Sequence, residues 1–264
     1  DIAHPPRCCY ALAPMNDHDH IPADPDNAPP REDGAPWRNF YGRRKGKQLR
    51  PGQIAHMEQT LPRLSVPKVG WDENPDRETL DLPALFGREA PRVLEIGFGG
   101  GEHLLAQASA HPGRDFIGCE PFVNGVAMLL PKLDEAGLTN VRLHMGDARD
   151  MLDVLPEAAL DMVYLLYPDP WPKKKHHRRR FVNPETLGPL ARALRPGGRF
   201  RIATDIADYV RHSLEKLHAA PEFEWLAESP GDWREPWDGW HRTRYETKAL
   251  REGRTPIYLE MRRR

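Results

Sequence analysis

Cysteine is scarce in this chain: there are three in 264 residues, and two of them, Cys8 and Cys9, are adjacent. Such a set builds no disulfide framework, which favours a reducing compartment. Long apolar runs are also missing, since the longest, 162–167 and 126–130, are far too short to cross a bilayer. The first residues are rich in proline and aspartate and do not resemble a secretory signal. The sequence therefore predicts a soluble, cytoplasmic protein with no membrane contact.

Charge is balanced in total but segregated along the chain. Lys and Arg number 38, Asp and Glu number 39, and the formal net charge is −1. Cations gather at 43–50, 173–180 and 262–264, whereas acidic residues gather between 222 and 238. A nucleic-acid-binding protein needs a segregated basic surface rather than a basic total. The distribution is compatible with such a protein despite the neutral sum.

Composition divides the chain into three parts. Residues 1–36 are rich in proline and poor in large apolar residues, so we expect a disordered tail that cannot offset its ordering entropy. Residues 37–91 are expected to form a basic N-terminal arm and a polar lead-in. Residues 92–264 alternate short apolar runs with amphipathic stretches, which predicts one α/β domain.

The pattern within this domain predicts its elements. We expect strands at 92–96, 116–119, 141–144, 161–166, 199–204, 223–226 and 257–261, and helices at 103–110, 123–136, 184–194 and 209–219. Gly137 suits the C-terminal cap of the second helix, whereas Pro131 predicts a kink or break inside it. Residues 196–198 predict a turn. The alternation implies a parallel sheet with helices on both faces.

The ends of the first five strands carry the polar chemistry. A glycine or a carboxylate follows each of them: Gly97, Glu120, Asp147, Asp169 and Asp205. Ligands of open α/β sheets bind outside the carboxyl ends of the strands. We therefore expect these residues to share one binding site.

The glycine loop after the first strand has a pattern that favours one class of cofactor over others. Its pattern is Glu95-x-Gly97-x-Gly99-x-Gly101, and Glu102 stands where a dinucleotide fingerprint needs a small residue. A Walker phosphate-binding pattern is absent. A strand-end carboxylate at Glu95 suits a cationic ligand group better than a phosphate.

The next two strand ends complete this cofactor hypothesis. Glu120 is placed for the two hydroxyls of a ribose, and Asp147 for the exocyclic amine of an adenine. An amino acid, a ribose and an adenine together describe S-adenosylmethionine.

Residues 167–180 are the most informative stretch of the sequence. Pro168 and Pro170 hold Asp169 in a stiff turn, and Trp171 precedes six cations and two histidines at 173–180. Aromatic and cationic side chains in succession suit base stacking and phosphate binding. His176 and His177 lack cysteine partners and a ligand spacing, so no metal site is expected.

Together these motifs resemble the class I S-adenosylmethionine-dependent methyltransferases, and more closely the bacterial tRNA (guanine-N7-)-methyltransferase family. The resemblance covers about 38–264 and is carried by residues 95–101, 118–121, 146–148, 168–180, 203–205 and 243–246. It implies a Rossmann-like class I methyltransferase fold, with a mostly parallel seven-stranded sheet and an antiparallel last strand. It also implies methyl transfer from S-adenosylmethionine to N7 of the variable-loop guanosine of tRNA.

The resemblance also implies roles for individual residues. The cofactor-binding set is Glu95, Gly97, Gly99, Gly101, Glu120, Asp147 and Asp169. The substrate-binding set is Lys173, Asp205, Thr243, Arg244, Tyr245 and Glu246, with Tyr245 where phenylalanine is usual. The RNA-binding set is Lys175, His176, His177, Arg178, Arg179 and Arg180. Asp169 is the expected catalytic residue, because a fixed carboxylate would stabilise the positive charge that grows on the purine.

The sequence is also compatible with two other functions and with two oligomeric states. An RNA or DNA amino-methyltransferase also places an acidic, proline-rich turn after its fourth strand, though usually with consecutive prolines. A Rossmann-like RNA-binding module without activity would keep the basic segments. For Thr243 and Glu246, a turn or a helix cap is the structural alternative to substrate contact. A monomer and a homodimer are equally compatible with the sequence.

Overall fold

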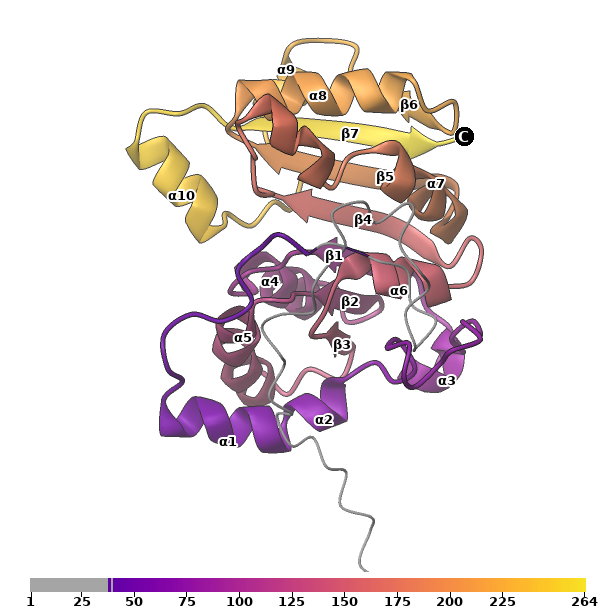
Figure 1. The fold of residues 1–264 in the computed structure, drawn as a ribbon, viewed down its shortest axis with the longest axis vertical. Helices are drawn as coiled ribbons and strands as arrows, with labels where there is room; N and C mark the ends of the chain where they lie inside the picture. The colour runs from indigo at the N-terminus through magenta and orange to yellow at the C-terminus, as the bar shows by residue number, and fades with distance from the viewer. Residues whose placement is uncertain (1–37, 39) are drawn as a thin grey trace, which may run out of the picture. The chain divides into compact units, whose positions relative to one another are not determined.

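The computed structural model describes residues 38 and 40–264, and the architecture below lies within Tyr41–Arg264. The tail predicted for residues 1–36 lies outside the described residues. Seven strands form one sheet in the order β3-β2-β1-β4-β5-β7-β6 (Figure 1). They are β1 (Arg92–Ile96), β2 (Asp115–Cys119), β3 (Val141–His144), β4 (Leu160–Leu166), β5 (Leu194–Thr204), β6 (Phe223–Trp225) and β7 (Ile257–Arg263).

Helices connect these strands. They are α1 (Pro51–Gln59), α2 (Leu61–Leu64), α3 (Leu82–Phe86), α4 (Glu102–Ala110), α5 (Val123–Glu135), α6 (Ala148–Val154), η2 (Lys174–Arg179, a 3₁₀-helix), α7 (Pro184–Ala193), α8 (Ala207–His218), α9 (Gly231–Arg234) and α10 (Arg244–Arg251). Strands β1 to β5 pair in parallel, and β7 is antiparallel to both β5 and β6. The predicted sheet with its antiparallel last strand is confirmed.

Alternating side chains bury both faces of the sheet. Leu94 and Ile96 of β1 belong to the cluster that includes the apolar faces of α6, α7 and α8. Val93 of β1 and Tyr164 of β4 belong to the cluster on the other face, with α4 and α5. Successive strand residues point to opposite faces, so short strands covered on both sides read as continuous apolar runs.

The strand register brings the predicted site residues to one edge. Ile96 pairs with Cys119 of β2 and with Leu165 of β4, and Cys119 pairs with His144 of β3. The carboxyl ends of these parallel strands therefore align. In Figure 1, α10 lies beyond the arrowheads of β4 and β5, at this same edge.

Two predicted interruptions differ in the structure. Helix α5 runs unbroken through Pro131, so the predicted break is absent. Leu129, Leu130 and Leu133 beside it are at most 2% exposed, and this packing offsets the hydrogen bond that proline removes. The predicted turn at 196–198 lies inside β5, where the register with β4 shifts and Gly197 has φ 78°.

The sequence analysis missed the short helices between residues 51 and 86. Helix α2 leads into Ser65, which bridges to Leu143 of β3, and Val66 donates to the Leu143 carbonyl at 2.9 Å. Val66 and Val69 are buried in the core cluster that lies on the α6–α8 face. The lead-in segment thus packs on the β3 edge and contributes to the core.

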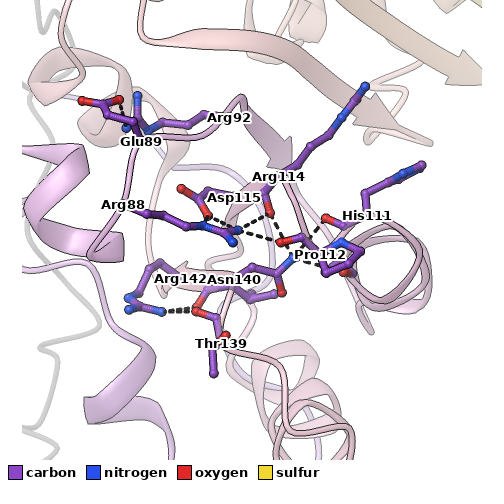
Figure 2. A network of polar contacts seen from close by, with 12 residues as sticks. Arg88, Glu89, Arg92, His111, Pro112, Arg114, Asp115, Thr139, Asn140 and Arg142 are labelled. Atoms are coloured by element: carbon purple, nitrogen blue, oxygen red, sulfur yellow. Dashed lines mark hydrogen bonds and ion pairs between the residues drawn. The ribbon is translucent and has the colours of Figure 1, made fainter.

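A polar network closes the opposite edge of the sheet, at the amino ends of the strands (Figure 2). Arg88 donates to Oδ1 of Asp115 from Nε at 2.8 Å and from Nη2 at 2.6 Å, and Asp115 is 0% exposed. Asn140 donates to the carbonyls of Ala108 and Arg114, each at 3.0 Å. Arg88 and Asn140 thereby tie the loops at this end together, although Oδ2 of Asp115 is buried without a hydrogen-bond partner among the described residues. The open polar chemistry lies at the other edge.

None of the helices in the described residues combines the length and the apolar character needed to cross a membrane.

Candidate active site

The glycine loop between β1 and α4 is held tightly against α5. A methyl group on Gly125 of α5 would lie 2.3 Å from the Gly99 carbonyl oxygen, and one on Gly101 would lie 2.6 Å from Leu129. Gly97, Gly99 and Gly101 all have positive φ, between 58° and 72°, a region that non-glycine residues rarely adopt. The loop therefore needs glycine both for its conformation and for its contact with α5.

Glu120 lies beside this loop at the end of β2. Its Oε2 accepts from the Gly99 amide at 2.6 Å and its Oε1 accepts from the Phe122 amide at 2.9 Å, and the residue is 7% exposed. Burial raises the pKa of Glu120 to about 6; the two amide bonds oppose this rise, and the charges of Asp169 and Glu95 add to it. The influence of Glu95 and Asp169 on Glu120 agrees with the alignment of the strand ends in the sheet.

Glu95 is buried below the loop. It is 3% exposed, and its Oε2 lies 2.7 Å from Nδ1 of His103 at the start of α4. The His103 ring, itself 1% exposed, packs against Tyr164 and Trp240 with centroid separations of 4.6 and 5.1 Å. The sequence analysis missed His103, because one histidine on an apolar helix face carries no signal for a charged partner.

Asp147 has a structural role at the start of α6. Its Oδ1 accepts from the Arg149 amide at 2.9 Å, which caps the helix. Its Oδ2 also pairs with the Arg149 guanidinium at 2.6 Å. The side chain keeps 19% exposure, so binding of an adenine amine by Asp147 stays a prediction.

Helix α10 covers the glycine loop with two of the predicted substrate residues. Arg244 pairs with Glu102 of α4 at 2.9 Å, and its guanidinium occupies the space beside Gly100. A methyl group on Gly99 would lie 3.2 Å from Cε2 of Tyr245, whose side chain is 48% exposed. Both residues therefore lie at the mouth of the loop.

The other members of the substrate set are engaged inside the protein. Thr243 is 6% exposed and caps α10 by accepting from the Glu246 amide at 3.2 Å. Glu246 is 2% exposed and accepts from Trp240, Arg242 and Tyr258 at 2.8 to 3.2 Å. Direct substrate contact by the Glu246 carboxylate does not agree with this burial, and the Thr-x-x-Glu pattern acts here as a helix cap with a buried anchor. Asp205 forms an ion pair with Arg254.

Asp169 lies between two residues whose backbone is strained. Tyr167 has φ 51° and Trp171 has φ 41°, so non-glycine residues adopt the left-handed region on either side of it. The Asp169 side chain is exposed, and no hydrogen bond or ion pair from the described chain reaches its carboxylate. Nearby protein atoms nevertheless desolvate the group and raise its pKa.

The cation run after Trp171 divides into faces. Helix η2 has three residues per turn, so residues three apart lie on the same side. His176 and Arg179 face Trp171: the rings of His176 and Trp171 are 6.0 Å apart, and the Arg179 guanidinium lies 4.9 Å from the Trp171 ring. Lys175 and Arg178 are exposed, without an acidic partner in the described chain. The exposed pair fits the RNA-binding prediction.

Arg180 contradicts the RNA-binding prediction. It is 1% exposed and pairs with Asp208 of α8 at 2.5 Å, because the third face of the run points into the protein. His177 lies on this same face, with Nε2 3.5 Å from Asp208. A guanidinium this deeply buried does not reach a phosphate.

The basic arm before α1 lies beside Trp171 and η2. The Tyr41 ring lies 6.0 Å from Trp171 and 4.1 Å from the Arg179 guanidinium. Asn124 of α5 accepts from the Gly46 amide and donates to the Lys47 carbonyl, both at 2.6 Å. The arm therefore runs from the cation loop to the start of α5. Neither Tyr41 nor Asn124 was identified from the sequence, since nothing local marks their partners.

Within residues 38 and 40–264, no group of three or more histidine, cysteine or acidic side chains is arranged to hold a metal ion.

Comparisons with known proteins identify the family of the chain. A family described as "Putative methyltransferase" matches residues 89–259. The tRNA (guanine-N(7)-)-methyltransferase of Ruegeria sp. (strain TM1040) is 61% identical over 240 residues, covering 90% of this chain and 93% of that protein. The protein of the same name from Roseobacter denitrificans (strain ATCC 33942 / OCh 114) is 60% identical over 224 residues, covering 85% and 95%.

A solved structure agrees on the fold. The crystal structure of the 16S rRNA methyltransferase KamB has a TM-score of 0.53 and 17% identity, covering 71% of this chain and 95% of that one. The sheet order and the glycine loop thus define a protein with the class I methyltransferase fold. At the level of sequence, the chain belongs to the tRNA (guanine-N(7)-)-methyltransferase family.

Proposed function

We propose that this protein transfers a methyl group from S-adenosylmethionine to N7 of a guanosine in tRNA. One observation carries the proposal: the partnerless Asp169 lies between the glycine loop with Glu120 and the exposed cations of η2. The identity of 61% to a tRNA (guanine-N(7)-)-methyltransferase supports it.

The residues at the strand ends fit the cofactor. When bound, S-adenosylmethionine supplies an electrophilic methyl group on a positively charged sulfur. Gly97, Gly99 and Gly101 let the backbone come close to the ligand, and Glu120 offers a carboxylate that hydroxyl groups of a ribose would satisfy. Glu95 and Asp169 add negative charge on the side where a cationic ligand would lie. This charge favours a sulfonium and an amino group over a phosphate.

The chemistry makes modest demands on the protein. Guanine N7 carries a lone pair at neutral pH, so no general base is required, and positioning supplies most of the acceleration. Positive charge moves onto the purine as the bond forms, and an ionised Asp169 beside the ring would stabilise it. The Asp169 carboxylate is already partly desolvated, so water screens this attraction less than it would in bulk.

Exposed cations form the RNA-binding part of the proposal. Lys173, Lys175 and Arg178 follow directly after the Asp169 turn, and Arg43, Lys45, Lys47 and Arg50 are exposed on the arm. Such side chains bind phosphates with little dependence on sequence and with strong dependence on salt. Because Asn124 fixes the arm, these two groups would contact one substrate together.

The decisive experiment uses methyl-labelled S-adenosylmethionine and unmodified tRNA transcripts, with and without a variable-loop guanosine. N7-specific chain cleavage maps the modified nucleotide. Cleavage at that guanosine alone is the expected result. Label at an exocyclic amine would instead support an amino-methyltransferase, and cofactor binding without any label would support an RNA-binding module. Asp169→Ala should abolish labelling while the dissociation constant for tRNA changes little.

A further inference from the structure

Arg180 is a buried cation on the far side of the loop that carries Asp169. It follows η2 directly, and its side chain is 0% exposed. The Tyr209 ring of α8 lies 5.3 Å from its guanidinium. A charge at this depth is costly unless it is paired and its donors are used. The donors of Arg180 therefore indicate its role.

Two of these donors hold the backbone of the Asp169 turn. Nε donates to the Pro170 carbonyl at 2.9 Å, and Nη2 lies 3.4 Å from the Trp171 carbonyl. The guanidinium is anchored in turn by α8, because Nη2 donates to Oδ2 of Asp208 at 2.5 Å and Nη1 to its carbonyl at 3.3 Å. One planar group thus ties the two residues after Asp169 to a rigid helix.

The conformation of this turn needs such support. Trp171 has a positive φ of 41°, and Tyr167 has one of 51°. Strained residues of this kind persist only where the surrounding structure over-determines them, and they cluster at functional sites. Arg180 supplies the constraint on the Trp171 side.

We infer that Arg180 is a positioning residue for methyl transfer: it fixes the Pro170–Trp171 backbone on α8 and so places the Asp169 carboxylate. The inference rests on the proposed function and adds a role that an arginine in a basic run does not suggest. Lysine does not replace it, because the fork of donors in fixed directions is what reaches three carbonyls and one carboxylate at once.

The test separates positioning from RNA binding. Arg180→Lys keeps the charge and removes the fork, whereas Arg178→Gln removes an exposed cation of the same run. We expect Arg180→Lys to lower the single-turnover methylation rate about 10²-fold, since an error near 1 Å has this effect. Its KM for tRNA and the salt dependence of binding should stay at wild-type values. Arg178→Gln should leave the methylation rate unchanged and weaken tRNA binding. The slope of the logarithm of the tRNA binding constant against the logarithm of the salt concentration should become shallower by about 0.9.

Asp208 provides a second route that does not depend on the folding of an Arg180 variant. Asp208→Asn should lower the same rate without changing tRNA affinity. The double variant should fall no further than Arg180→Lys alone, because coupled residues are not additive. Arg211→Gln is the control, since Arg211 pairs with the other oxygen of Asp208 and is 68% exposed. It should leave the rate unchanged.

Each outcome decides one question. If wild-type protein methylates tRNA and Arg180→Lys keeps its rate within about threefold, the inference is wrong while the proposed function stands. If Arg180→Lys instead raised KM for tRNA and changed the salt dependence of binding, Arg180 would be an RNA-binding residue and the inference would be overturned. Wild-type protein that methylates no RNA would remove the proposed function itself.

Discussion

Glu120 should make cofactor binding depend on pH near 6. Its carboxylate is buried beside the glycine loop, and burial raises its pKa from 4.5 to about 6. This difference corresponds to about 2 kcal/mol between the two protonation states. The folded protein holds the proton more tightly than the unfolded chain. The contribution of Glu120 to stability is therefore fully present below pH 4.5 and is lost as the pH rises through 6.

Cofactor binding should show the opposite trend. Ribose hydroxyls donate best to the ionised carboxylate, so binding favours the charged form and competes with the proton. For one such group the dissociation constant of the cofactor should rise about tenfold as the pH is lowered from 7.5 to 5. Isothermal titration calorimetry of S-adenosylmethionine at both pH values measures this change, and urea unfolding without cofactor measures the stability change.

Glu120→Gln is the matched control, because it keeps the shape and removes the titration. Other groups with shifted pKa values, such as Asp169 and His144, remain in both proteins, so the difference between the two proteins isolates Glu120. The variant should bind more weakly at pH 7.5, because the NH₂ group that replaces one carboxylate oxygen cannot accept the Gly99 or Phe122 amide bond made by that oxygen. Parallel pH profiles for the two proteins would refute the role assigned to Glu120.

Three further changes test the neighbouring parts of the site. Gly125→Ala should push the loop at Gly99 away and weaken cofactor binding by calorimetry at least tenfold, about 1.4 kcal/mol, as its methyl group would lie 2.3 Å from a carbonyl. Gly113→Ala, which meets nothing within 4 Å, should stabilise the fold by about 0.4–1 kcal/mol in urea unfolding and leave binding unchanged. Asn124→Ala removes two arm contacts and should weaken tRNA binding, measured by fluorescence anisotropy, between about fivefold and thirtyfold. Unchanged tRNA affinity would show that the arm is not part of the RNA site.

The sequence predicted the sheet, and the end of the sheet at which the polar strand ends meet, because both depend on local features. A short apolar run ending in glycine or a carboxylate marks the end of a buried parallel strand, and parallel strands place such ends along one edge. On this basis Glu120 and Asp169 are predicted to share one site. The short helices before β1 were missed because proline and polar residues dominate there, and their order comes from packing against β3 and the core.

Residue roles inside a motif were harder to predict, because they depend on partners far away in sequence. The anchor of Glu246 includes Tyr258 across a turn, and the partner of Arg180 is Asp208 on the next helix but one. Neither pairing has a periodic signature. A pattern of adjacent residues thus assigned Glu246 and Arg180 to ligands, whereas the structure buries both side chains.

The three-residue repeat of η2 explains why one cation run serves several purposes. Its inward face, His177 and Arg180, meets Asp208 and fixes the turn, whereas His176 and Arg179 on a second face pack against Trp171. Lys175 and Arg178 on the remaining face, and Lys173 and Lys174 at the start of the run, stay exposed in the described chain to bind phosphates. In an α-helix, with 3.6 residues per turn, residues three apart would not stay on one side over these eight residues. The 3₁₀ geometry therefore lets the same short segment hold the Asp169 turn and present cations beside it.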